Sequence, residues 1–152
     1  MPKLITFIPC ERILLGATDK SISLIGVLNM ITISDPPKVV PAGAQVPYRW
    51  SVFTKWLGES SDEGKTYEQK LLLLDSTDKE LFSNVTQFTG EKLRPQMIHM
   101  MIGDFFSLPF LNEGIYQLVV EWKEKSVENW DRVGTYPFMV GHVKSPVTAP
   151  TP

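Results

Sequence analysis

The residues of this chain that could carry out covalent chemistry are one cysteine, Cys10, and two histidines, His99 and His142. A thiol beside an imidazole base is the arrangement found in cysteine nucleophiles. The three residues are far apart in the sequence, and neither a local signature nor a third orienting residue accompanies Cys10. Because free cysteine is among the most buried residue types, we expect Cys10 to be a structural core residue. The chain is therefore predicted to have no catalytic residues and not to be an enzyme.

Acidic side chains gather in three places: residues 62–63, residues 75–78, and Glu121 with Glu124 and Glu128. The first two could hold calcium at a turn, but the fixed spacing of a strong calcium loop is absent. The isolated histidines and cysteine give no zinc spacing, and no pair of carboxylates for sugar hydrolysis can be identified. We therefore expect solvated surface charges, with no metal site and no cofactor.

The aromatic residues are the strongest candidates for binding. Trp50 and Trp122 lie on apolar faces of expected strands and are predicted to pack in the core. Trp56 and Trp130 lie near strand ends, where an aromatic ring is either packed at the rim or exposed. Together with Tyr48 they are the candidate binding residues, and the surface they could form would contact a sugar or a protein.

The elements that would position these residues are β-strands. Residues 114–123 alternate strictly, with Tyr116, Leu118, Val120 and Trp122 on one apolar face, which is typical of a strand with one face in a core. Similar segments recur along the chain. The eight expected strands cover residues 4–15, 21–34, 45–57, 67–75, 80–89, 97–106, 114–123 and 130–143.

Turn chemistry and prolines refine this pattern. Residues 4–15 and 21–34 are predicted to form a long hairpin, with a break or bulge at Pro9 and with the second strand inside a sheet, since it is apolar on both faces. Further hairpins are expected between 67–75 and 80–89 and between the last two strands. Pro137 suggests an edge strand or a bulge. The polar loop 59–65 has no apolar anchor and is expected to be mobile.

The pattern predicts an all-β protein: a two-sheet immunoglobulin-like β-sandwich of about eight antiparallel strands, in one domain over residues 1–144. A closed barrel is the alternative. Residues 145–152, SPVTAPTP, are proline-rich and poor in apolar residues, and are expected to form a disordered tail.

Two stretches carry a resemblance to a known family. Residues 7–11, FIPCE, lead through the first hairpin into residues 23–27, SLIGV, and residues 114–120 read GIYQLVV. The chain resembles a family of small uncharacterised bacterial β-sandwich proteins over most of its length, to about Val140. The resemblance implies a single β-sandwich domain. It implies no activity and no catalytic residues.

Composition excludes several further classes of function. The net charge of −2 gives no electrostatic case for binding nucleic acid or a membrane, and no stretch is long and apolar enough for a spanning helix. A single cysteine excludes an internal disulfide, and a cytoplasmic location is expected. Two functions are predicted: a non-enzymatic module that binds a protein partner or forms a homo-oligomer, since sandwiches leave edge strands, or a carbohydrate-binding module that uses Trp56, Trp130 and Tyr48.

Overall fold

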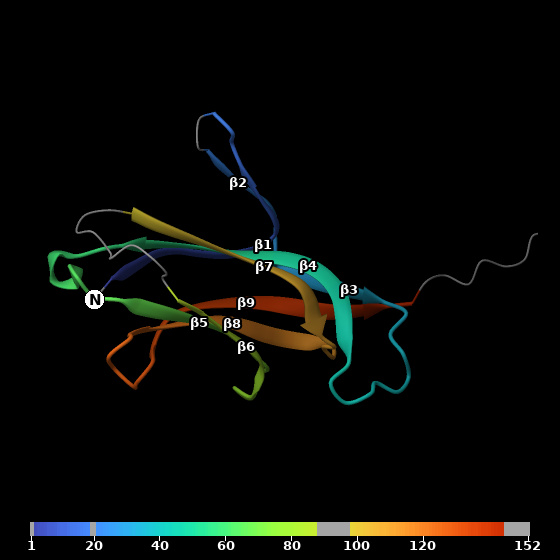
Figure 1. Cartoon of the computed structure of the whole chain (residues 1–152). Helices are drawn as coiled ribbons and strands as arrows, with labels where there is room; N and C mark the ends of the chain where they lie inside the picture. The colour runs from blue at the N-terminus through green and yellow to red at the C-terminus, as the bar shows by residue number, and fades with distance from the viewer. Residues whose placement is uncertain (1, 19–20, 88–97, 145–152) are drawn as a thin grey trace, which may run out of the picture.

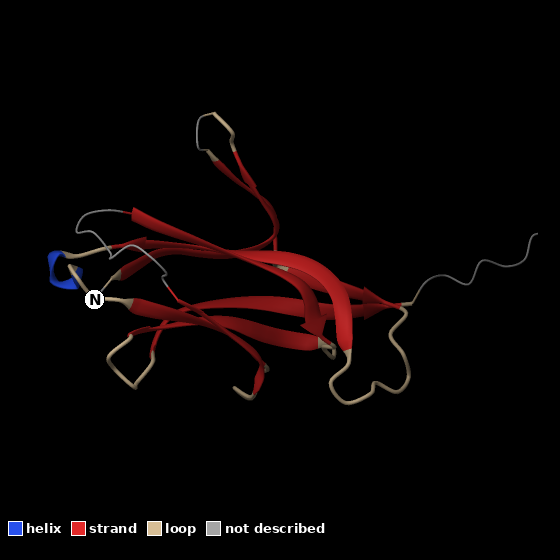
Figure 2. Cartoon of the chain, viewed as in Figure 1, coloured by secondary structure: helices blue, strands red, loops and turns tan. Residues whose placement is uncertain are grey.

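The chain forms two β-sheets that pack face to face (Figures 1 and 2). The structure is a computed structural model and describes residues 2–18, 21–87 and 98–144. Sheet A contains four strands in the order β2 (Ile22–Val27), β1 (Lys3–Leu15), β4 (Gln45–Leu57) and β7 (Ile98–Pro109). Sheet B contains five, in the order β3 (Met30–Ser34), β9 (Asp131–Val143), β8 (Gly114–Glu124), β5 (Tyr67–Leu74) and β6 (Glu80–Gln87). The predicted all-β, two-sheet architecture is confirmed.

Two details of the strand count and direction differ from the prediction. Within the described residues nine strands form instead of about eight, and the pair β3–β9 is parallel, whereas every other pair there is antiparallel. The three predicted hairpins are present as β1–β2, β5–β6 and β8–β9. The strand expected over residues 97–106 is present as β7 (Ile98–Pro109). The predicted tail, residues 145–152, lies outside the described residues.

The prediction of one inner strand over residues 21–34 is wrong. The segment divides into β2, the last strand of sheet A, and β3, the last strand of sheet B. At the division the Leu28 backbone N–H donates to the Pro9 carbonyl at 3.0 Å, and the Leu28 side chain is buried. Gly26 precedes it with a φ of +64°, a conformation that favours glycine. Leu28 therefore anchors the chain where it crosses from one sheet to the other.

The prediction of a break or bulge at Pro9 is also wrong, whereas the prediction for Pro137 is confirmed in its second form, because β9 carries an irregularity. Pro9 pairs with Val52 in β4, and the irregularity of this strand pair lies instead between Leu4 and Thr6. Pro137 lies in β9, which pairs with β8 over residues 131–140 but with β3 only from Met139 onward. The irregularity of the β8–β9 pair lies between Gly134 and Arg132 of β9, where Val133 is the extra residue. Pro9 is thus accommodated inside the ladder, whereas Pro137 lies in a part of β9 that pairs with β8 alone among the described strands.

The core lies between the sheets and is centred on aromatic rings. The Trp56 ring stacks on Trp122 with centroids 4.0 Å apart, and Trp122 stacks on Tyr67 at 5.2 Å. Trp50 and Trp122 are buried, as predicted. The buried Gln69 Oε1 accepts hydrogen bonds from Thr54 Oγ1 at 2.9 Å and from Trp56 Nε1 at 3.1 Å. This polar link joins the two sheets, because Gln69 belongs to β5 and the other two residues belong to β4.

The loop that follows β4 is anchored, contrary to the prediction. It contains a 3-10 turn, η1 (Ser60–Asp62), and Asp62 is completely buried. The Tyr67 hydroxyl donates to Asp62 Oδ1 at 2.6 Å, and the Glu59 backbone N–H donates to Oδ2 at 2.8 Å. Although burial opposes ionisation, these bonds hold the pKa of Asp62 below its usual value. The loop is thus anchored by a buried carboxylate, whereas the prediction considered only apolar side chains as anchors.

Candidate interaction surface

Half of the β1–β2 hairpin leaves the sandwich. β1 pairs with β4 only as far as Cys10, which lies opposite Ser51. Beyond that point, residues 12–15 of β1 pair with residues 22–25 of β2 and with no other strand of the described chain. We call these two segments the arm. Figure 1 shows it rising from sheet A on the side away from sheet B. An isolated two-stranded ribbon is only marginally stable in water, so an element of this kind gains from being covered.

The arm is apolar on both of its faces. Cross-strand partners share a face, so the register places Leu14 beside Ser23 and Ile25 beside Arg12 on one face. On the opposite face Ile13 pairs with Leu24, and Leu15 pairs with Ile22. Leu14 is 50% exposed and Leu15 is 64% exposed. Each face of the ribbon thus presents aliphatic side chains to its surroundings.

The outer face of sheet A continues this surface. β7 turns Met101 and Phe105 toward the core, and the ring of Phe105 stacks on Trp50 at 4.4 Å. The alternate residues of β7 point outward by the period of a strand. Four of them are large, apolar and 40–70% exposed: Ile98, Met100, Ile102 and Phe106. We call these four the floor.

Apolar residues connect the floor to the arm. Phe53 lies opposite Ile102, and Ile8 of β1 lies opposite Phe53, so apolar side chains cross three strands of sheet A on its outer face. Cys10 pairs with Val27 at the base of the arm, and Val27 is 43% exposed. The arm and the floor therefore form one L-shaped apolar surface.

Cys10 marks the corner of this surface and has the properties of a structural residue. Its side chain is completely buried, and burial raises the pKa of the thiol, with a further contribution from the charge of Asp104. A nucleophilic cysteine needs the opposite shift. His99 pairs with Trp56 at the far end of sheet A, and His142 lies in sheet B with its Nε2 2.9 Å from the Leu111 carbonyl. The structure does not bring Cys10 and the histidines together.

The three aromatic residues predicted to bind a ligand do not form one surface. Trp56 is completely buried in the core stack, so a surface role for this ring does not fit the structure. Trp130 is half-buried just before β9, with Lys123 Nζ 4.9 Å and Lys70 Nζ 5.8 Å from its ring centroid. Tyr48 packs against the core from β4. Trp130 thus neighbours the side chains of β5 and β8, far from Tyr48 in the arrangement of strands.

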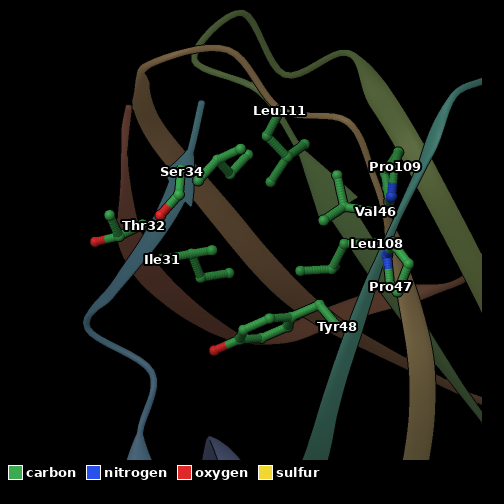
Figure 3. A pocket seen from close by; sticks show the side chains of 10 residues that line it. Ile31, Thr32, Ser34, Val46, Pro47, Tyr48, Leu108, Pro109 and Leu111 are labelled. Atoms are coloured by element: carbon green, nitrogen blue, oxygen red, sulfur yellow. The ribbon is translucent and has the colours of Figure 1, made fainter. Parts of the chain in front are cut away.

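Tyr48 does line a pocket, which opens between the two sheets beside β3 (Figure 3). The pocket has a volume of about 200 Å³ and is mostly apolar. Its lining residues are Ile31, Thr32, Ile33, Ser34, Val46, Pro47, Tyr48, Leu108, Pro109 and Leu111. Burial raises the pKa of the Tyr48 hydroxyl, with a contribution from the charge of Glu11. A second, open groove lies on the other side of Tyr48, between Arg49 and the base of the arm at Glu11 and Arg12.

The acidic residues close a turn of the fold and form ion pairs on the surface. Asp75 Oδ1 accepts hydrogen bonds from the Thr77 backbone N–H at 2.8 Å and from its hydroxyl at 2.7 Å, which closes the β5–β6 turn. On sheet B, Glu121 is 3.6 Å from Lys70, and Glu124 is 3.2 Å from Lys65. Within residues 2–18, 21–87 and 98–144, no group of three or more His, Cys, Asp or Glu side chains could hold a metal ion.

The surface formed by the arm and the floor was missed by sequence reasoning, although its signal is present. Residues 22–27 are apolar on both faces, which we took as the mark of an inner strand. Residues 98–106 are also apolar on both faces, with Met101 and Phe105 on one and the floor on the other. A strand of this kind is covered on both sides either by its own chain or by another. Nothing in the local pattern separates the two cases.

The fold and this surface define a two-sheet all-β protein with a projecting hairpin. No protein-family model matches the chain, and no curated protein matches it. A solved structure described as the X-ray structure of Northeast Structural Genomics Consortium target SoR45 is similar over 76% of this chain and 83% of that chain, with 13% sequence identity and a TM-score of 0.39. No helix in the described part of the chain is long and apolar enough to cross a membrane.

Proposed function

We propose that the chain is a non-enzymatic protein-interaction module whose contact surface is the arm together with the floor. The observation that carries this proposal is the arm itself, which pairs with no third strand in the part of the chain that the structure describes and exposes Leu14 and Leu15 to solvent. Monomeric soluble proteins rarely expose continuous apolar surface on this scale unless it contacts a partner. A membership in the family of small bacterial β-sandwich proteins, an immunoglobulin-like topology and a cytoplasmic location stay predictions.

A protein suits this surface better than a sugar or a reaction substrate does. The exposed apolar side chains are aliphatic, apart from Phe106, whose ring has the Arg49 guanidinium 5.7 Å from its centroid. Sugars are bound by flat aromatic faces with polar neighbours, and Trp56 is not accessible for that purpose. A surface of leucine, isoleucine, valine and methionine gains stability by excluding water against another apolar surface.

Site-specific photo-crosslinking tests the proposal. A photoreactive amino acid is placed at Leu14 in one variant and at Val85 in another, and each is irradiated in cells that produce the protein. The two positions are matched, because Leu14 is 50% exposed on the arm and Val85 is 51% exposed on β6 of the other sheet. We expect discrete protein adducts from position 14 and none from position 85. No adduct from position 14, or the same adducts from both positions, would contradict the proposal.

A further inference from the structure

We infer that the partner is a second copy of this chain, and that two copies clasp each other with their arms around a two-fold axis. The inference rests on the proposed function, since it uses the same surface and names its occupant. In the clasp, the arm of each copy lies in the corner between the partner's arm and the partner's floor. The contact is isologous, because the same patch serves both copies.

The first support is the area of the surface. The exposed fractions of the arm residues Leu14, Leu15, Ile25 and Val27 and of the four floor residues correspond to roughly 700 Å² of apolar surface. A specific interface of standard size buries about 800 Å² on each partner. The arm and the floor together therefore supply an area of the size that a stable dimer needs.

The second support is that the arm is apolar on both faces. Its own sheet lies on one side only, so covering the arm completely requires a second apolar surface. In a clasp, the face with Leu14 and Ile25 meets the equivalent face of the partner's arm. The opposite face, with Leu15 and Ile13, meets the partner's floor around Met100. Each apolar face of the ribbon thus finds an apolar counterpart that the same sequence provides.

The charges of the molecule permit this contact. The net charge is only −2, so two copies repel each other weakly. Two charged side chains of opposite sign belong to the surface itself. Arg12 lies beside Ile25 on the arm, and Asp104 lies between Ile102 and Phe106 on the outward face of β7, where it accepts a hydrogen bond from Ser51 Oγ at 2.5 Å. A smaller exposed apolar group on sheet B, made of Met30, Ile115 and Met139, offers a control surface of the same chemistry.

Light scattering coupled to size-exclusion chromatography tests the inference on the full chain. We expect a dimer that dissociates on dilution, and a dissociation constant raised at least roughly thirtyfold by Met100→Glu or by Leu14→Glu, since each places a charge in a buried apolar contact. Met139→Glu is the matched control, because Met139 is 51% exposed and Met100 is 52% exposed. It should leave the dimer unchanged. Circular dichroism checks that every variant is folded.

Mixed-chain crosslinking tests the arrangement. One chain carries Leu15→Cys and the other carries Met100→Cys, while the buried Cys10 stays in place. Mild oxidation of the mixture should give a disulfide-linked pair of two different chains, and a mixture of Leu15→Cys with Met139→Cys should not. Equal crosslinking of both mixtures would overturn the clasp.

The outcomes separate this inference from the proposed function. A chain that is monomeric at all concentrations, yet gives adducts with a different protein at position 14, would overturn the clasp and leave the interaction module standing. A dimer that resists both Met100→Glu and Leu14→Glu would overturn the clasp as well. A strict monomer with no adduct at position 14 would overturn both.

Discussion

The core stack and the arm are built from similar large apolar side chains on neighbouring strands, but only the stack is covered by the chain itself. Trp56, Trp122 and Tyr67 are at most 2% exposed, whereas Leu14 and Leu15 are at least half exposed. The difference lies in the layers around them. The stack has a sheet on each side, and the arm has left its sheet. Whether a side chain is buried in this fold therefore depends on whether a second sheet covers its strand, and not on the apolar content of the strand alone.

The largest effect is expected from the stack. Trp56→Ala removes a ring that contacts Trp122 and donates to Gln69 and Thr54, and it leaves a cavity between the sheets. We expect a loss of about 3–5 kcal/mol in the free energy of unfolding, measured by urea denaturation. Trp56→Phe keeps most of the volume and should lose less. A loss below about 1 kcal/mol from Trp56→Ala would show that the stack is not the centre of the core.

Removing the polar link between the sheets should have the next largest effect. Gln69→Leu replaces the amide with an apolar side chain of similar size and leaves the Thr54 hydroxyl without its acceptor. The Trp56 indole N–H loses one of its two acceptors and keeps Thr54 Oγ1. A buried donor without an acceptor costs about 1–3 kcal/mol, which the same urea experiment measures. If Gln69→Leu is as stable as the parent chain, water or a neighbouring group must replace the amide oxygen.

Much of this core could be predicted from the sequence. Tyr116, Leu118, Val120 and Trp122 alternate in β8 and all point into the core, since a strand of period two with one apolar face has one natural orientation. The same reasoning gave three hairpins, two sheets and the burial of Cys10. Local alternation and turn chemistry are enough for these features, because they depend on neighbours in the sequence.

The features that could not be predicted depend on distant residues. The division between β2 and β3 requires the hydrogen bond between Leu28 and Pro9, some nineteen positions apart in the sequence. The position of Trp56 near a strand end leaves both rim packing and exposure open, whereas sheet B buries its ring through Trp122. Residues 21–34 are predicted to lie inside a sheet because their first part is apolar on both faces, which is the pattern of a strand covered on both sides. The periodicity of such a strand does not show whether its own chain or another chain covers it.

The buried carboxylate of Asp62, which anchors η1, should have an intermediate effect on the free energy of unfolding, and this effect depends on pH. The pKa of Asp62 is lowered in the folded chain, while in the unfolded chain it stays near its ordinary value of about 3.9. The stability that this carboxylate contributes is therefore complete above about pH 4, and it is lost as the pH falls below that value toward the lowered pKa. Urea denaturation at a series of pH values should show this loss.

The control for the pH experiment is the next residue. Asp62→Asn should flatten the acid side of the stability profile, because the group no longer ionises. Glu63→Gln changes an exposed carboxylate in the same loop and should leave the profile as it is. Equal profiles for the parent chain and Asp62→Asn would mean that other carboxylates control the acid response.

The smallest effect on the free energy of unfolding is expected from substitutions in the arm. These substitutions are the sharpest test of the difference between the core stack and the arm. Leu14→Ser and Leu15→Ser change side chains that touch little of their own chain, so at concentrations where the chain is monomeric each should alter the free energy of unfolding by less than about 0.5 kcal/mol. The same substitutions should weaken self-association. A loss of about 2 kcal/mol in the monomer would show that the arm folds back and packs on its own sheet in solution. An unchanged monomer that no longer associates would show that these leucines act only between chains.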